Sequence, residues 1–308
     1  MNKLDRLKKG DTIALLNPSF CEKDAENNAK RITDVLKARG YNVKLMPSFF
    51  AKDGYFAGSD EVRTKDIDDA FNDKEVKAII CMRGGSGATR IVDKIDYEAI
   101  RRNPKIFCGY SDITVLLNAI SSRAHFPTIH GLCGVSLFSS DDRSNRSFFD
   151  FLETPSKDKV LKNNKYISHT LVGGVCEGEL VGGNLTLIAT LLGTEYKIDF
   201  TDKIVFIEDV SESPYRIERY FSSLRLSGEL EKAKGFVFGY FTKCTGEEGK
   251  QSVFDVVKEY FAHLGKPVLY GFECGHEFPF VTLPIGAKVR LDADNKTLKI
   301  LEEIYDED

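Results

Sequence analysis

The sequence predicts an α/β fold, in which a mostly parallel N-terminal sheet flanked by helices precedes a smaller C-terminal α/β domain. Two observations predict this class. Short apolar runs alternate with segments of helical period through the first half, which is typical of β-α-β units in a parallel sheet. The segment 139–168 is rich in Asp, Arg, Asn, Lys and Ser, so we place a connection within it and expect two cores in the 308 residues.

The first half supplies four predicted strands and three predicted helices. Each strand is a short apolar run, and each helix has its apolar residues on one face. The N-terminal domain is assigned residues 1–155, and 156–169 is the connection. The strands are expected at Thr12–Leu16, Tyr41–Met46, Val76–Met82 and Lys105–Cys108, and the helices over Lys23–Arg39, after the cap Ser59/Asp60, and around Ile91, Val92 and Ile95.

The second half, residues 170–308, is predicted to form the smaller domain. It opens with Thr170–Val181 and a turn at Gly182-Gly183-Asn184. Apolar runs predict strands, Pro214 suits the first turn of a helix, and a hairpin is expected near the C-terminal end. The predicted strands are Lys203–Ile207, Gly235–Phe241 and Pro267–Phe272. The predicted helices run from Pro214 to Gly228 and over Val253–Leu264, and the hairpin is expected near Lys288–Leu301.

Composition argues against several functional classes. With 42% hydrophobic and 29% charged residues the chain resembles globular proteins. Its net charge of −4, without a Lys/Arg-rich block, argues against nucleic acid as a partner. No apolar run reaches the ~20 residues of a membrane span, and the N-terminus lacks the apolar core of a signal sequence. We therefore expect a cytoplasmic protein without a membrane partner.

The cysteines and histidines give no sign of a disulfide framework or a metal site. The cysteines form no C-x-x-C pair, and no histidines are spaced as metal ligands. Most of the cysteines fall within apolar strand-like runs, so we expect buried, reduced thiols, as in cytosolic proteins. The seven are Cys21, Cys81, Cys108, Cys133, Cys176, Cys244 and Cys274.

The segment Lys105–Leu117 carries the first candidate for chemistry. An apolar strand ends in Gly109-Tyr110-Ser111-Asp112, and a run of helical period follows at once. A serine on such a turn presents its hydroxyl at the carboxyl end of the sheet, beside the N–H groups of a helix start. Ile113 stands where the hydrolase elbow pattern has its second glycine. A plain helix cap at Ser111 or Asp112 is therefore the alternative.

A glycine-rich turn, Arg83-Gly84-Gly85-Ser86-Gly87, follows the preceding strand. It lacks the Lys-Ser/Thr of a phosphate-binding loop and the spacing of a dinucleotide fingerprint, so tight turning is its simplest role. In a parallel sheet this turn reaches the same edge as Ser111. One of its N–H groups could then bind an oxyanion together with the N–H of Asp112.

Acid and base candidates lie in the second half. The strand Lys203–Ile207 runs into Glu208-Asp209, whose carboxylates are either a solvated rim or the partner of a histidine. His276 is the strongest base candidate of the five histidines because it follows a strand on a glycine-containing loop, and His130 is second. Ser111, Glu208 and His276 have the residue types of a nucleophile, an orienting acid and a general base, but their spacing in the sequence does not show that they meet.

These motifs resemble those of the LD-carboxypeptidase family, the serine peptidases that include murein tetrapeptide carboxypeptidases and microcin C self-immunity enzymes. The likeness runs through nearly the whole chain. The matching motifs are Gly10–Ile13, Pro18-Ser19, Ala57–Asp60 with Arg63, Arg83–Gly87, Gly109–Thr114, His130-Gly131, Gly182–Leu185, Gly193-Thr194, Glu208-Asp209, Pro214–Arg219, Gly275-His276 and Leu283–Gly286.

The resemblance implies a triad of Ser111 as nucleophile, His276 as general base and Glu208 as the acid that orients it. It also implies an oxyanion hole from backbone amides near Gly85 and Asp112, an active site at the domain interface, a homodimer, and no metal or organic cofactor. The implied reaction is hydrolysis of an L,D-peptide bond in a small peptide or muropeptide. It would proceed through an acyl-enzyme on the serine and release a terminal D-amino acid.

Departures from the family pattern concern the substrate. Ser86 replaces the usual aromatic residue of the glycine loop, Glu218 stands where aspartate is commoner, and Leu132 stands where proline is usual. The segment after His276 is bulkier than usual because it carries Phe278 and Phe280. Each departure leaves the implied triad intact and bears on the shape of the pocket.

Three functional hypotheses follow. A cytoplasmic carboxypeptidase that releases D-alanine from murein tetrapeptides during peptidoglycan recycling is the leading one. A peptidyl-nucleotide peptidase of the microcin C immunity kind is the alternative, because Tyr215, Phe278 and Phe280 could stack on a base. An alternative of another class is a muropeptide-binding protein without catalysis, and the presence of all three triad residue types argues against it.

Overall fold

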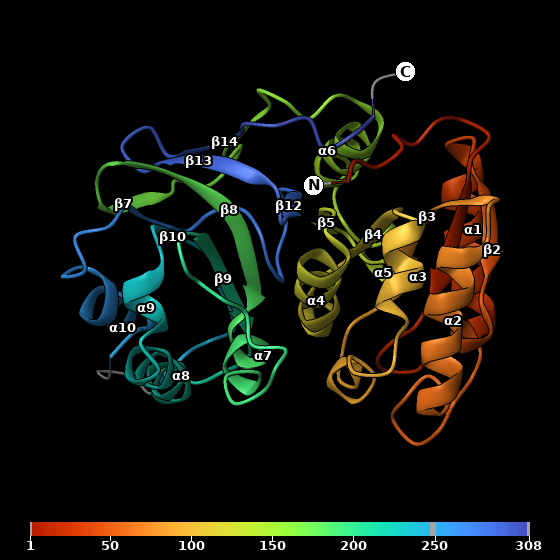
Figure 1. The fold of residues 1–308 in the computed structure, drawn as a ribbon, viewed down its shortest axis with the longest axis horizontal. Helices are drawn as coiled ribbons and strands as arrows, with labels where there is room; N and C mark the ends of the chain where they lie inside the picture. Colours follow the sequence, from red (N-terminus) through yellow and green to blue (C-terminus); the bar gives the residue numbers. More distant parts are fainter. Residues whose placement is uncertain (1, 247–250, 307–308) are drawn as a thin grey trace. The chain divides into compact units, whose positions relative to one another are not determined.

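The computed structural model describes residues 2–246 and 251–306. They form two compact α/β units, each with its own mixed sheet (Figure 1). The first unit comprises Met1–Ser156, Thr282–Gly286 and Glu303–Asp308, and the second comprises Lys157–Val281 and Ala287–Glu302. The chain therefore passes from one unit to the other at 156/157, 281/282, 286/287 and 302/303. The expected α/β class is confirmed.

The first unit contains a six-stranded sheet with the order β12-β5-β4-β3-β1-β2. Strands β1 to β5 are parallel, and β12 pairs antiparallel with β5. Because parallel strands end at the same edge, the residues after β1, β3 and β4 gather there. The strands are β1 (Thr12–Leu16), β2 (Asn42–Leu45), β3 (Val76–Cys81), β4 (Ile106–Gly109), β5 (Thr128–His130) and β12 (Leu283–Ile285), so the four predicted strands are confirmed.

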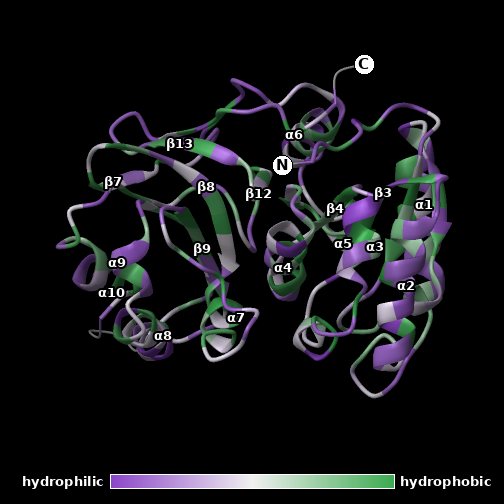
Figure 2. Ribbon diagram, in the orientation of Figure 1, coloured by the Kyte–Doolittle hydropathy of each residue, from purple (hydrophilic) through white to green (hydrophobic). Residues whose placement is uncertain are grey.

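Several helices of the first unit begin at side-chain caps. Ser59 accepts a hydrogen bond from the N–H of Val62 at the start of α2, as the sequence predicts, and Asp24 caps α1. Helix α2 carries both hydrophobic and hydrophilic residues along its length (Figure 2). The helices are α1 (Ala25–Ala38), α2 (Asp60–Asn72), α3 (Tyr97–Arg102), α4 (Thr114–Ala124), α5 (Gly134–Leu137) and α6 (Asp142–Glu153), with short 3₁₀ turns at Pro47–Phe49, Ala88–Arg90 and Ser111–Ile113.

The helix expected around Ile91, Val92 and Ile95 does not form. A 3₁₀ turn and a run of further turns lead instead to α3, which begins after Asp96. The three apolar side chains are buried all the same, so their spacing reports burial rather than helix. The carboxylate of Asp96 accepts the N–H of Ala99 at 2.9 Å, and this cap sets the later start.

The second unit contains an eight-stranded sheet with the order β6-β14-β13-β8-β9-β10-β11-β7. Strands β8 to β11 are parallel, and the outer strands run antiparallel to their neighbours. Hydrophobic residues dominate β9, which lies inside the sheet (Figure 2). The elements are β6 (Val160–Leu161), β7 (His169–Val172), β8 (Val175–Asn184), α7 (Leu185–Thr190), β9 (Ile204–Val210), α8 (Pro214–Leu226), α9 (Glu229–Lys232), β10 (Gly235–Thr242), α10 (Val253–Phe261), β11 (Val268–Tyr270), β13 (Lys288–Asp292) and β14 (Thr297–Ile300).

The predicted turn at Gly182-Gly183-Asn184 is wrong, because these residues are the last three of β8. Gly182 has a φ of 111°, and a Cβ on it would lie 2.1 Å from the carbonyl oxygen of Phe206 on β9. Glycine here therefore permits close approach of two strands rather than a reversal of the chain. The hairpin expected over Lys288–Leu301 is present as β13 and β14.

The compact units differ from the expected domain ranges. Most of the expected connection, 157–169, belongs to the second unit, where β6 pairs with β14. Two C-terminal segments belong to the first unit: β12 extends its sheet, and Tyr305 is fully buried there and donates its hydroxyl to the carbonyl of Phe151 at 3.0 Å. Polar composition marks exposed edge segments as readily as it marks a linker, which explains the difference.

Among the described residues, no helix combines the length and apolarity that crossing a bilayer requires. All seven cysteines are free thiols, and five of them are buried. Burial raises the pKa of the Cys133 thiol to about 12. The described part of the chain also has no cluster of three or more His, Cys, Asp or Glu side chains that could hold a metal ion.

Candidate active site

Ser111 begins the 3₁₀ turn that leads from β4 into α4. Its φ is 67°, in the left-handed region that a residue other than glycine adopts only under constraint. Two residues earlier, a Cβ on Gly109 would lie 3.0 Å from the side chain of Ile113, so glycine permits the close turn. The half-buried Ser111 thus has the strained strand-to-helix geometry that presents a nucleophilic hydroxyl, although the second glycine of the elbow pattern is absent.

The glycine loop after β3 lies against Ser111. A Cβ on Gly84 would be 2.8 Å from the Cβ of Ser111, 3.0 Å from its Oγ and 3.2 Å from the backbone nitrogen of Asp112. Gly85 has a φ of 121°, and a Cβ on it would lie 2.4 Å from the ring of Phe20. Glycines therefore bring the loop backbone beside the serine hydroxyl and the amide of Asp112. Backbone N–H groups near a nucleophile are what an oxyanion hole requires.

The side chain of Asp112 ties the serine turn to two other loops. It is buried, and its Oδ2 accepts the hydroxyl of Ser19 at 2.6 Å and the N–H of Ala88 at 2.9 Å. Burial raises the pKa of this carboxyl group. The residue that the sequence offers as a cap thus joins the loops after β1, β3 and β4.

Arg63 on α2 contacts the loops after β1 and β3. Its side chain is fully buried and ion-paired with Asp60. Its Nη1 donates to the carbonyls of Pro18 at 2.7 Å and Gly87 at 3.0 Å. These contacts give a structural role to residues that the family resemblance singles out without a role.

Glu208 and His276 form a hydrogen-bonded pair in the second unit. Glu208 lies on β9 and is fully buried, and its Oε2 lies 2.6 Å from Nδ1 of His276 on the loop after β11. Burial alone would lower the pKa of His276, but the charge and hydrogen bond of Glu208 outweigh burial and raise it, and Asp209 adds to the effect. With Nδ1 held in this way, Nε2 is the nitrogen suited to exchange a proton with a reactant.

The loop that carries His276 is held in place by the three residues before the histidine. A Cβ on Gly275, whose φ is 131°, would lie 2.9 Å from Oε2 of Glu208, so only glycine fits. The carbonyl of Cys274 accepts the N–H of Tyr240 at 2.8 Å. The buried Glu273 accepts the N–H groups of residues 164–166 at 2.6–2.7 Å. Nothing in the local sequence signals this last anchor.

Asp209 is buried beside Glu208, which excludes a solvated rim for the two acids. Its Oδ1 accepts Nδ2 of Asn184 at 3.0 Å, and its Oδ2 accepts N and Oγ1 of Thr186 at 3.0 and 2.9 Å. The same Nδ2 lies 3.3 Å from Oε1 of Glu208. Burial, followed by the charge of Glu208, raises the pKa of Asp209 to about 6.

The second histidine candidate has a different environment. His130 ends β5 in the first unit and is fully buried, and its ring centroid is 6.1 Å from that of Tyr110. It therefore has the character of a packed core residue, whereas the side chain of His276 is 15% exposed beside an acid.

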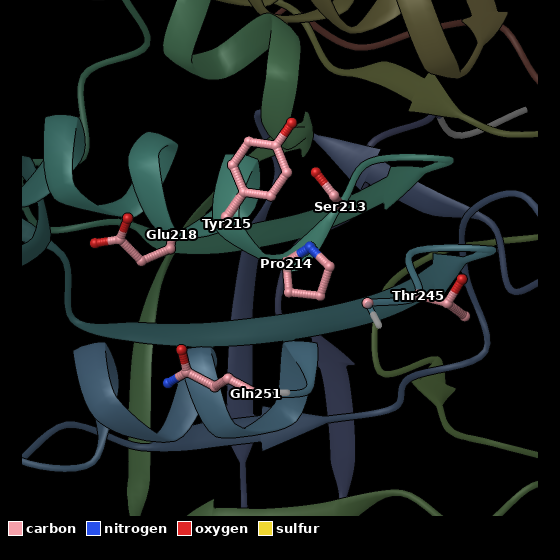
Figure 3. Close-up of a pocket in the computed structure, with 7 residues that line it drawn as sticks. Ser213, Pro214, Tyr215, Glu218, Thr245 and Gln251 are labelled. Carbon is pink, nitrogen blue, oxygen red and sulfur yellow. The ribbon is translucent and has the colours of Figure 1, made fainter. Parts of the chain in front are cut away.

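A cavity of about 570 Å³ lies at the N-terminus of α8 in the second unit. Figure 3 shows Ser213, Pro214 and Tyr215 at the start of α8, together with Gln251 from the segment before α10. Tyr215 is 61% exposed, so its ring is available to a ligand, whereas Phe280 is 2% exposed and is not. The full lining is Ser213, Pro214, Tyr215, Glu218, Thr245, Gly246 and Gln251.

Comparison with known proteins adds to this geometry. The protein-family model of the LD-carboxypeptidase N-terminal domain matches residues 13–131. The family model of the LD-carboxypeptidase C-terminal domain matches residues 177–291. The chain is 36% identical over 305 residues to a probable murein peptide carboxypeptidase of Bacillus subtilis (strain 168). That alignment covers 96% of this chain and 92% of the relative.

Two solved structures have the same fold. One is MccF in complex with glutamyl sulfamoyl guanosine, with a TM-score of 0.91 and 25% identity over 99% of this chain and 100% of the other. The other is a muramoyltetrapeptide carboxypeptidase from Oxalobacter formigenes, with a TM-score of 0.83 and 29% identity over 95% of this chain and 99% of the other.

Proposed function

This chain belongs to the LD-carboxypeptidase family of serine-type peptidases, and from that premise we propose that it releases the terminal D-alanine from murein tetrapeptides. In this proposal Ser111 is the nucleophile, His276 the general base and Glu208 the orienting acid. The observation that carries the proposal is the 2.6 Å contact between Nδ1 of the histidine and the buried Glu208 carboxylate. A histidine held in this way has the geometry of a general base.

In the first half of the reaction, Oγ of Ser111 attacks the carbonyl carbon of the L,D-peptide bond while Nε2 of His276 accepts the hydroxyl proton. The N–H groups of Gly85 and Asp112 stabilise the oxyanion, and loss of one such donor typically costs about 3–4 kcal/mol of transition-state stabilisation. The imidazolium then donates its proton to the nitrogen of the departing D-alanine, and an acyl-enzyme on Ser111 is left.

The second half regenerates the enzyme. His276 takes a proton from a water molecule, whose oxygen attacks the acyl carbonyl. The second tetrahedral intermediate collapses, the shortened peptide leaves as a carboxylic acid, and the imidazolium returns the proton to Oγ of Ser111. The carboxylate of Glu208 stabilises the imidazolium in both halves.

A second candidate is the hydrolysis of a peptidyl-nucleotide. It is favoured by the exposed ring of Tyr215 on the cavity at the start of α8, since a flat ring can stack on a base. The likeness to MccF in complex with glutamyl sulfamoyl guanosine also supports it. Aromatic stacking tolerates many partners, so this observation ranks second to the murein peptide.

We also propose that the reaction takes place in the cytoplasm, as part of peptidoglycan recycling, and that the enzyme is a homodimer. The seven free thiols support a reducing compartment. The dimer rests on the family resemblance, and light scattering on the purified protein tests it. A monomer mass at the concentrations used for the assay would rule it out.

The decisive experiment measures D-alanine release from L-Ala-γ-D-Glu-diaminopimelate-D-Ala by mass spectrometry. We expect release by the wild type and none above background by Ser111→Ala. A matched control is Ser122→Ala, which changes an exposed serine of α4 and should leave the rate unchanged. Glutamyl sulfamoyl guanosine assayed in parallel tests the second candidate. Cleavage of the nucleotide alone would replace the murein peptide as substrate.

A further inference from the structure

Two buried carboxylates stand next to each other at the end of β9. Glu208 is 0% exposed and contacts His276, whereas Asp209 is 2% exposed and is absent from the proposed triad. Placing a second negative charge in this interior is costly unless it is paired and hydrogen-bonded. Its retention beside the acid of the triad therefore needs a reason.

Asn184 connects the two acids. It lies opposite Glu208 in the pairing of β8 with β9, and its Nδ2 reaches Oε1 of Glu208 at 3.3 Å and Oδ1 of Asp209 at 3.0 Å. Its Oδ1 accepts the N–H of Leu187 and so caps α7. An ionised carboxylate only accepts hydrogen bonds, so the amide NH₂ must face the acids.

Asp209 is held by more donors than Asn184 alone. Its Oδ1 also accepts the N–H of Val210 at 2.7 Å, and its Oδ2 accepts both the N–H and the hydroxyl of Thr186. Hydrogen bonds to the charged form favour ionisation and oppose the effect of burial. Asp209 is therefore charged at neutral pH, with a pKa of about 6.

We propose that Asp209 is a positioning residue for the pair formed by Glu208 and His276. It fixes the amide of Asn184, which holds Oε1 of Glu208 and thereby directs Oε2 to the histidine. Its charge also adds to that of Glu208 in stabilising the protonated imidazole. The inference rests on the proposed role of His276 as the general base.

The proposal predicts how acid inactivates the enzyme. The titratable groups coupled to Asp209 are Glu208 beside it, His276 from the loop after β11 and Cys244 from the end of β10. Burial raises the pKa of the Cys244 thiol to about 11, so it carries no charge in this range. As the pH falls, His276 takes up a proton and Asp209 takes up a second near pH 6. The acid limb of kcat/KM should therefore have a slope approaching two.

The first test is Asp209→Asn, with Asp199→Asn as a matched control at an exposed aspartate. The pKa of His276, followed by NMR titration without substrate, should fall by about one unit because a nearby negative charge is removed. The value of kcat should fall about tenfold to a hundredfold with KM nearly unchanged. The acid limb should move to lower pH, and its slope should drop to one. The control should match the wild type.

Two further variants separate charge from geometry. Asn184→Ser can still cap α7 but removes the bridging amide, so kcat should fall about tenfold, and the pKa of His276 should fall less than in Asp209→Asn because both negative charges remain. Thr186→Val removes one donor to Asp209, which raises the pKa of that aspartate and moves the steep part of the acid limb to higher pH. This variant carries the test if Asp209→Asn does not fold.

An unchanged pKa of His276 in a folded Asp209→Asn variant would overturn the proposal, because a merely structural aspartate predicts lower stability without a shift. The proposal would also be overturned if none of these substitutions moved the acid limb of the kcat/KM profile. The NMR titration needs no substrate, so its outcome stands even if the enzyme does not hydrolyse murein peptides.

Discussion

The turn that carries Ser111 and the loop that carries His276 are held in place by different physical means. Ser111 is placed by steric constraint, with a φ of 67° and the backbone of Gly84 packed against its side chain. His276 is placed by charge, through the buried carboxylate of Glu208 and the hydrogen bonds that support it. Steric placement is indifferent to pH but stores backbone strain, whereas placement by charge depends on protonation.

The largest expected effects come from changing Ser111 itself. Ser111→Gly and Ser111→Ala should both lower kcat by at least about 10⁴-fold, because each removes the proposed nucleophile. Glycine adopts a positive φ without strain, so the free energy of unfolding of Ser111→Gly should exceed that of Ser111→Ala by about 1 kcal/mol. Urea denaturation measures the difference. Equal stability of the two variants would show that the turn is unstrained.

Glu208→Gln should cause the next largest loss of activity, because it removes the charge that holds His276. The value of kcat should fall about 10³–10⁴-fold because the imidazolium loses its counter-charge. The pKa of His276 should fall toward or below its ordinary value, so the remaining activity should persist to lower pH. A pH–rate profile checks this, with Glu231→Gln, on the exposed face of α9, as the control. An unmoved acid limb would contradict the assignment of the base.

The same substitution tests how stability depends on pH. Because the folded-state pKa of His276 is raised above its unfolded value, the pair stabilises the fold below about pH 6.5, and this contribution is lost as the pH rises through the folded-state pKa. Glu208→Gln should therefore lose most stability on the acid side. Thermal unfolding at pH 6 and pH 9 measures the trend.

A matched pair of glycine substitutions sharpens the comparison. A Cβ on Gly84 would press on Ser111, and one on Gly275 would press on Oε2 of Glu208. Each alanine variant should lower kcat about a hundredfold through small displacements. Only Gly275→Ala should also shift the acid limb, because it disturbs the contact that raises the pKa of His276. Identical pH profiles for the two variants would remove the distinction.

The smallest effect is expected from a change at Asp60, the ion-pair partner of Arg63. Hydrogen bonds from Arg90, opposed by burial and helped by Lys94 and Arg63, lower the pKa of Asp60 to about 2. A lowered pKa stabilises the fold above the unfolded value near 4, and the contribution is lost as the pH falls toward 2. Asp60→Asn should cost about 2 kcal/mol at pH 7, because it removes the charged partner of the buried Arg63 guanidinium. Urea denaturation at pH 7 and pH 2.5 should show a smaller difference in acid.

The sequence predicts much of the fold because periodicity reports burial and local caps report helix starts. The strands β1 to β4, the cap at Ser59 and the C-terminal hairpin follow from such local patterns. The pairing of β12 with β5 does not, since it joins segments more than a hundred residues apart in the chain. The strand character of Gly182 is likewise set by its neighbour Phe206.

The candidate site divides in the same way. Ser111 and His276 stand out because of turns and glycines beside them. The contact of His276 with Glu208 spans 68 residues, and only the family resemblance anticipates it. The supporting roles of Asp209 and Asn184 could not be predicted, because they depend on a shared hydrogen bond that sequence spacing does not encode.

The return of the C-terminal segments to the first unit has a consequence for biosynthesis. A ribosome that has released residues 1–156 has made every parallel strand of the first sheet, but β12 and Tyr305 follow only after most of the second unit. Until then β5 is an open sheet edge, which invites pairing with other chains. The first unit therefore waits for segments that are made after most of the second, and its β5 edge stays unprotected until β12 has been made.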